Sequence, residues 1–132
     1  TENLVMSDPN GAARCLDELH ELGVRLVIDD FGRGYSSLSY LRRLPVDEIK
    51  IDRSFVLGLQ GNPQTLAIVR AILGLADGLD MRVVAEGIET QADLACLAAE
   101  GCKEGQGFYF SEARPQGEAL KLLREAPRRQ VA

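Results

Sequence analysis

Short apolar segments that end in charged or polar side chains recur along this chain, and segments with helical spacing separate them. Where strands and helices alternate in this way, the strands are parallel and their carboxyl ends meet at one edge of the sheet. The pattern therefore predicts an α/β fold in which acids, a lysine and an amide surround one mouth. Carboxylates grouped in this way hold divalent metal ions or transfer protons. The side chains at the segment ends are Asp29, Asp30, Lys50, Asp52, Glu86 and Gln106.

Turn residues and periodicity indicate where the helices and strands begin. Asp8-Pro9 and Asn62-Pro63 are each typical of a helix start, because the first residue can cap the helix and proline fits its first turn. Residues 90–93 resemble a capping box with aspartate in place of glutamate. Helices are expected from residues 9, 63 and 91, with a short helix that ends at residue 44 and a last one over residues 118–124. Strands are expected at residues 24–28 (buried), 48–51, 82–85 and 108–110.

This order of elements suits a β/α barrel or an open doubly wound sheet. Four strands are too few to close an eight-stranded barrel, so a half-barrel would leave a sheet edge open at each end. Three arrangements remain open: the chain is part of a longer barrel, two copies complete one another, or the sheet is open. Residues 1–124 are assigned to one partial domain and residues 125–132 to a C-terminal tail.

Composition restricts the partners and the cellular location. The chain has 15 Lys and Arg against 20 Asp and Glu, a net charge of −5, whereas nucleic-acid binding needs a basic face. No apolar run approaches the roughly 20 residues of a membrane span, and the polar start does not resemble a signal peptide. Cys15, Cys96 and Cys102 form no close pair, which is typical of reduced thiols in a cytosolic protein. We expect a cytoplasmic location, with neither nucleic-acid binding nor membrane insertion.

Alternation along the second strand indicates how its polar side chains point. Lys50 lies between Ile49 and Ile51, so the period of two places Lys50 and Asp52 on the face opposite the isoleucines. A lysine that points into an interior is costly unless it is paired or has a chemical task. An edge strand with its lysine in solvent is the alternative interpretation.

The acidic residues at the other segment ends also have two interpretations. Asp29 and Asp30 lie where the strand alternation breaks, so both can turn toward the mouth, but such a pair also occurs in a helix cap or a solvated turn. Glu86 and Glu89 precede a helix, whose dipole favours acids near its start. His20 lies on the polar side of the first helix, and we expect no catalytic role for it.

In combination, the motifs resemble those of the EAL domain family, the bacterial cyclic di-GMP phosphodiesterases. Residues 29–32 resemble its DDFG motif, and residues 50–52 fall in its KID segment. Residues 86–90 match its EGVET motif with isoleucine for valine, residues 106–107 match its QG motif, and residues 1–2 resemble the end of its ExTE motif. Four motifs in order are specific, although each alone is weak. The resemblance implies the C-terminal half of a TIM-like (β/α)8 barrel.

The resemblance also implies an activity and a role for each motif residue. The family hydrolyses cyclic di-GMP to linear pGpG with two divalent cations, Mg²⁺ or Mn²⁺. The resemblance further implies a homodimer that involves the region of residues 35–37, and sensory or GGDEF domains upstream. The implied metal ligands are Asp29, Asp30 and Asp52, and the implied catalytic residues are Lys50, Glu86 and Gln106. Glu2 and Glu89 would anchor the loop or orient groups at the mouth, and the implied substrate loop contains Phe31, Gly32 and Gly34.

Part of the family pattern lies outside this sequence or departs from it. The first half of the family domain, with three further metal ligands, is absent, so we expect the 132-residue chain to be inactive alone. Arg33 stands in place of a common threonine, Lys103 of aspartate, Phe108 of tyrosine and Ala113 of proline. None of these four residues is an implied metal ligand.

Two other functions are compatible with parts of this sequence. The first is a catalytically inactive EAL-like module or fragment that binds cyclic di-GMP or a protein partner, which the absent ligands favour for this polypeptide. The second is a receiver domain, which has an acidic pair, an aspartate and a lysine in a chain of similar length. In a receiver domain, however, the lysine lies at the end of a later strand, and Glu86 would have no role there.

Overall fold

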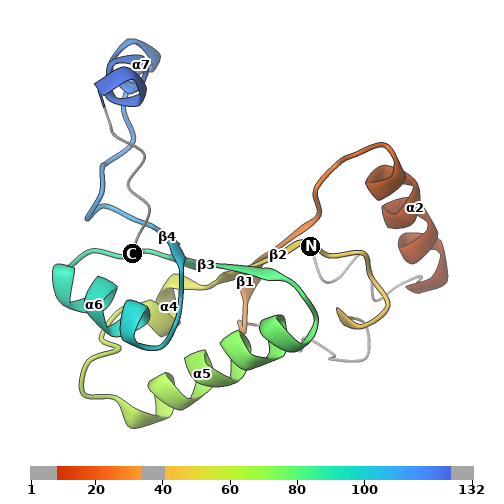
Figure 1. The fold of residues 1–132 in the computed structure, drawn as a ribbon, viewed down its shortest axis with the longest axis horizontal. Coiled ribbons are helices and arrows are strands. Elements are labelled where there is room, and N and C mark those ends of the chain that lie inside the picture. The colour runs from red at the N-terminus through yellow and green to blue at the C-terminus, as the bar shows by residue number, and fades with distance from the viewer. Residues whose placement is uncertain (1–8, 34–40, 126–132) are drawn as a thin grey trace.

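A computed structural model describes residues 9–33 and 41–125, which contain a four-stranded parallel sheet (Figure 1). The strands lie in the order β1 (Val27–Phe31), β2 (Glu48–Ile51), β3 (Arg82–Glu86) and β4 (Glu104–Gln106). The helices are α2 (Pro9–Glu21), α4 (Arg53–Val56), α5 (Pro63–Gly78), α6 (Gln91–Ala99) and α7 (Gln116–Glu125). Because each strand pairs with the next along the chain, the strand order never reverses, as it would in a doubly wound sheet.

The side-chain caps that the sequence predicts at residues 62 and 90 begin α5 and α6. The Asn62 side chain accepts hydrogen bonds from the backbone N–H groups of Gln64 and Thr65, and proline occupies the first position of α5. The Thr90 hydroxyl oxygen accepts from the Asp93 N–H at 3.1 Å at the start of α6. These caps satisfy donors that have no partner within the helix.

The apolar core lies on one side of the sheet. Ile49 and Ile51 of β2 are fully buried, together with Val69 and Ala76 of α5. Figure 1 shows α5 and α6 on the same side of the sheet, and α5 contacts β2 and β3. Leu97 of α6 belongs to the same cluster. This face of β2 is therefore a structural support for the residues on its opposite face.

Charged residues lie on the other face of the sheet. Glu48 and Lys50 of β2 alternate with the two buried isoleucines and are half-buried. The guanidinium of Arg82 lies 3.1 Å from a Glu48 oxygen and 4.0 Å from a Glu104 oxygen, so it links three neighbouring strands. The predicted separation of Lys50 from the isoleucines is confirmed.

The expectation for the first strand is wrong in its bounds and in its burial. Pairing starts with Val27 opposite Glu48, and Val27 is exposed. The preceding Leu26 is tied to Asp47 instead: its N–H donates to the Asp47 carboxylate at 2.7 Å, and its carbonyl accepts from the Asp47 N–H at 2.9 Å. The strand begins only after this link, and it lies at an edge of the sheet.

The expectation for the fourth strand is also wrong. The ladder partners of β3 are residues 104–106, whereas residues 108–110 form a turn in which the Phe110 N–H donates to the Gly107 carbonyl at 3.1 Å. Phe108 is 63% exposed. Aromatic residues favour strands in general, but here the pairing ends at Gln106 and the aromatic residues follow it.

The remaining expectations concern the ends of the chain and the connections. Helix α4 was not predicted, and α7 begins two residues before the expected 118–124 helix and lies apart from the sheet (Figure 1). Most of the short helix expected before residue 44, and residues 126–132 of the expected tail, lie outside the described residues. All three cysteines are free. Among the described helices, none has both the length and the apolar character required to cross a bilayer.

Candidate active site

A distortion of β1 brings two neighbouring carboxylates to the same edge of the sheet. The register with β2 shifts between Ile28 and Phe31, and Asp30 has a φ of 53°. Ordinary alternation would send adjacent side chains to opposite faces, whereas a β-bulge re-aims one of them. Aspartate tolerates a positive φ better than most residues. The predicted break in alternation at Asp29 and Asp30 is confirmed.

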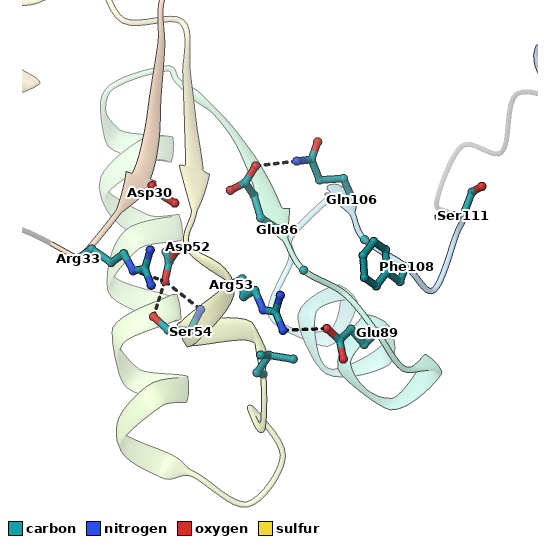
Figure 2. A pocket seen from close by; sticks show the side chains of 13 residues that line it. Asp30, Arg33, Asp52, Arg53, Ser54, Glu86, Glu89, Gln106, Phe108 and Ser111 are labelled. Carbon is teal, nitrogen blue, oxygen red and sulfur yellow. Dashed lines mark hydrogen bonds and ion pairs between the residues drawn. The ribbon is translucent and has the colours of Figure 1, made fainter. Parts of the chain in front are cut away.

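Four strands contribute side chains to one hydrogen-bonded cluster. Lys50 Nζ lies 2.8 Å from Glu86 Oε1 and 3.3 Å from Asp29 Oδ1. Gln106 Nε2 donates to the same Glu86 oxygen at 2.6 Å, as Figure 2 shows. Glu86 is thus held by one charged donor and one neutral donor. The structure brings all four predicted residues together.

The Lys50 ammonium is the positive centre of this cluster. Its hydrogen bond to Glu86 raises the pKa of Lys50 above the usual 10.5, partial burial opposes that rise, and Asp29 adds to it. Lys50 is therefore protonated at neutral pH. Its single charge faces three carboxylates, those of Asp29, Asp30 and Glu86, so the group retains an excess of negative charge.

Those three carboxylates meet the requirements of a divalent cation. One oxygen from each lies within 4.8 Å of the others. Two oxygens bound to one Mg²⁺ are at most about 4.2 Å apart, since each bond is about 2.1 Å. Asp29 and Asp30 are exposed, so small rotations of their side chains can bring the oxygens from within 4.8 Å of one another to the separation that the metal requires. Mg²⁺ and Mn²⁺ prefer such oxygen ligands, so the residues fit the metal.

Asp52 has a structural task beside this group. It accepts a 2.9 Å hydrogen bond from the Ser54 N–H at the start of α4 and a short one from the Ser54 hydroxyl, and it pairs with Arg33 Nε at 3.3 Å. Loss of hydration raises the pKa of Asp52, but these hydrogen bonds and the Arg33 charge outweigh it and hold the pKa below 3.8. Asp52 is ionised and 4% exposed.

The cluster opens into a pocket of about 530 Å³, within the size range of small-molecule sites. Arg53 lies across it and forms an ion pair with Glu89 at 3.2 Å (Figure 2). Phe108 lies at its rim, beyond Gln106. The pocket therefore presents carboxylates, two guanidinium groups and one exposed aromatic ring.

A close backbone contact fixes the distance between the ends of β3 and β4. The Ile88 N–H donates to the Gln106 carbonyl at 3.1 Å, and the Ile88 carbonyl accepts from the Tyr109 N–H at 3.0 Å. Gly107 lies between these bonds, and a Cβ there would collide with the backbone of Ile88. Glycine is required at this position so that Gln106 can reach Glu86.

The sequence pattern that defines the EAL domain family matches residues 1–113. The chain belongs to the EAL domain family. The cyclic di-GMP phosphodiesterase NbdA of Pseudomonas aeruginosa is 44% identical over 124 residues, which are 94% of this chain and 16% of NbdA. The chain spans a fifth or less of the first curated relatives it matches.

Solved EAL structures share the fold of this chain. The EAL domain of Mycobacterium smegmatis DcpA is 45% identical with a TM-score of 0.85, over 91% of this chain and 55% of that one. A manganese and cyclic di-GMP complex of Klebsiella pneumoniae BlrP1 is 37% identical with a TM-score of 0.75, over 82% of this chain and 28% of that one. The predicted fold class, part of a TIM-like EAL barrel, is confirmed.

The EAL motif residues differ in how they relate to the site. Phe31 is buried in the core rather than open to the pocket, and Gly32 lies in the turn after β1 with a φ of 101°. Glu89 reaches the pocket through its pair with Arg53. Glu2 and Gly34 lie outside the described residues, as does the region of residues 35–37 that was expected to contact a second subunit.

Sequence reasoning missed the functional part of two charged pocket residues of this EAL chain. Arg53 was not considered, although its place directly after the KID segment could have marked it. Arg33 was noted only as a departure from the family pattern, and its ion pair with Asp52 was not foreseen. Arg33 and Asp52 lie 19 positions apart, so no local sequence pattern reveals their contact.

The lowered pKa of Asp52 predicts a dependence of stability on pH. A carboxyl group whose pKa is lowered by folding contributes stability above its ordinary pKa of 3.8, and this contribution is lost as pH falls through the folded value. We expect Asp52→Asn to reduce the free energy of unfolding by about 1 kcal/mol near pH 7, since asparagine still caps a helix but carries no charge.

Urea unfolding of both proteins at about pH 7 and about pH 3 measures this contribution. The difference between wild type and Asp52→Asn should shrink at the lower pH. An unchanged difference would show that the charge of Asp52 adds nothing to stability.

Proposed function

We propose that this chain is part of a cyclic di-GMP phosphodiesterase domain that forms linear pGpG in second-messenger signalling. The observation that carries the proposal is the cluster of Asp29, Lys50, Glu86 and Gln106, contributed by four strands to one edge of the sheet. NbdA is a cyclic di-GMP phosphodiesterase and BlrP1 binds cyclic di-GMP with manganese, and the similarity of both proteins to this chain supports the proposal.

The proposed metals are Mg²⁺ or Mn²⁺, two for each complete site. Asp29, Asp30 and Glu86 would hold one cation, and Asp52 would contribute to the second. A bound divalent cation offsets phosphate charge and lowers the pKa of water. The manganese complex of BlrP1 supports a divalent metal.

The remaining roles follow from the contacts of the chain's own residues. Lys50 would hold Glu86 and Asp29 in place through its hydrogen bonds, and its ammonium would attract a phosphate oxygen or the attacking water. Gln106 would fix the orientation of Glu86 through its 2.6 Å hydrogen bond. Glu86 would then accept a proton from water, a task that a fixed carboxylate can perform.

The organisation of the whole protein is part of the same proposal. Residues 1–124 would form one part of the EAL domain and residues 125–132 a tail. Upstream sensory or GGDEF domains, a homodimer and a cytoplasmic location are carried over from the family. The alternative function, an inactive module that binds cyclic di-GMP or a protein, applies best to the 132-residue chain by itself, since it spans 55% of the solved DcpA chain.

Hydrolysis of cyclic di-GMP by the whole protein and by the 132-residue chain tests the proposal. With Mn²⁺ or Mg²⁺ the whole protein should form pGpG, and chelation by EDTA should stop the reaction until metal is restored. The isolated chain should show no turnover, because three family ligands lie outside it. Product formation that co-elutes with the chain from a sizing column would refute that last expectation.

A whole protein that binds cyclic di-GMP but never hydrolyses it, with either metal, would contradict the proposed activity. That result would favour the inactive binding module instead. Isothermal titration with cyclic di-GMP, with product measured in the same samples, separates binding from turnover.

A further inference from the structure

The turn after β1 directs Arg33 toward the pocket. The Arg33 N–H donates to the Asp30 carbonyl at 3.3 Å, which closes the turn. Gly32 within it has a φ of 101°, and a Cβ there would lie 2.6 Å from the Phe55 ring. The turn is thus packed against a fixed ring, and the residue that follows Gly32 lines the pocket beside Asp30.

Arg33 then pairs with a carboxylate that faces the candidate metal ligands. Its Nε lies 3.3 Å from Asp52 Oδ1, and the Arg33 side chain is 65% exposed against 5% for that of Asp52. Figure 2 shows the guanidinium beside Asp52, with Asp30 above it and Glu86 across the pocket. The contact places a positive charge on a pocket carboxylate.

The ion pair between Arg33 and Asp52 is weak enough to be exchanged for a contact with a metal ion. Arg33 Nε lies 3.3 Å from Asp52 Oδ1, which is longer than the roughly 2.7–2.9 Å of strong charge-assisted arginine–carboxylate hydrogen bonds. An exposed arginine loses little free energy when its ion pair breaks and its guanidinium is hydrated instead. A hard divalent cation also seeks carboxylate oxygens, and the positive charge of Arg33 beside Asp52 opposes a second positive charge there.

We infer that Arg33 is a tethered cation that competes with a divalent metal ion for Asp52 and so weakens metal binding at this site. The inference rests on the proposed function, which makes Asp52 a metal ligand. Arg33 stands in place of the family's common threonine, which carries no charge, so the competition is a property of this chain. It sets the metal concentration that the site requires rather than the chemistry that the site performs.

Titration of the whole protein with Mn²⁺, followed by the electron paramagnetic resonance signal of the free ion, tests the inference without substrate. Arg33→Thr should tighten Mn²⁺ binding about fivefold, the equivalent of one exposed ion pair. Arg14→Thr on α2 is the matched control, since it removes the same charge from an exposed side chain outside the pocket. Its affinity should equal that of the wild type.

A second pair of variants isolates the role of Asp52. The Asp52→Asn variant retains a helix-capping side chain but has no carboxylate at position 52 for Arg33 and the metal to compete for. In this background, Arg33→Thr should therefore leave the Mn²⁺ affinity unchanged. Three results would overturn the inference: equal affinities of wild type and Arg33→Thr, no Mn²⁺ binding to either, or an equal gain in Arg14→Thr or in the Asp52→Asn background.

The titration is separate from the test of the proposed function. A gain in Mn²⁺ affinity in a whole protein that does not hydrolyse cyclic di-GMP would support the competition and reject the activity. Hydrolysis by the whole protein, with no gain in Mn²⁺ affinity in Arg33→Thr, would support the activity and reject the competition.

Discussion

Replacing Glu86 by glutamine in the whole protein should lower the turnover number for cyclic di-GMP about a thousandfold. Glutamine has nearly the same shape, and its carbonyl oxygen can still accept a hydrogen bond, so the fold should persist. What the substitution removes is the negative charge that Lys50 and Gln106 hold at 2.8 and 2.6 Å. The site would lose both a proton acceptor and one of three clustered carboxylates.

Steady-state hydrolysis at saturating Mn²⁺, with unfolding curves on the same samples, measures this effect. Glu18→Gln is the matched control, because Glu18 is an exposed residue on α2 outside the pocket, and it should turn over like the wild type. Near-normal turnover in Glu86→Gln would remove Glu86 from the chemistry. A fall in activity matched by a fall in the unfolding midpoint would indicate a structural role instead.

Local signals allowed much of the fold to be predicted from sequence. The Asn62-Pro63 start of α5 and the Thr90 cap of α6 depend on residues within one helical turn, and both are confirmed. The alternation of Lys50 with its isoleucine neighbours is a property of one strand. Lys50 and Glu86 could be placed together because carboxyl ends of parallel strands share one edge.

The errors arose where the structure depends on contacts between distant segments. The start of β1 is set by the link between Leu26 and Asp47, which lie 21 residues apart. The end of β4 is set by the bonds of Gln106 and Tyr109 to Ile88. Aromatic propensity alone therefore placed the fourth strand too late. The Arg33–Asp52 pair is a third contact of this kind.

Gly107→Ala should destabilise the chain by about 3 kcal/mol, the upper part of the range for overpacking a close contact. The new Cβ would meet the nitrogen, carbonyl carbon and oxygen of Ile88, which are backbone atoms and have no rotamer to escape to. Relief requires the ends of β3 and β4 to separate. That movement would break the Gln106 hydrogen bond to Glu86 as well as the two backbone bonds of Ile88.

Urea unfolding of the chain, with Gly74→Ala as the matched control, measures the cost. Gly74 lies within α5, where a Cβ would meet nothing within 4 Å, so alanine there should stabilise by about 0.5–1 kcal/mol. The same added methyl group should therefore act in opposite directions at the two positions. Because helix propensity cannot explain a loss at Gly107, a difference of about 3 kcal/mol or more between the variants would locate the cost in the contact with Ile88. Equal stabilities would mean that the β3 and β4 ends can separate freely, and that Gln106 is not held against Glu86 by the backbone.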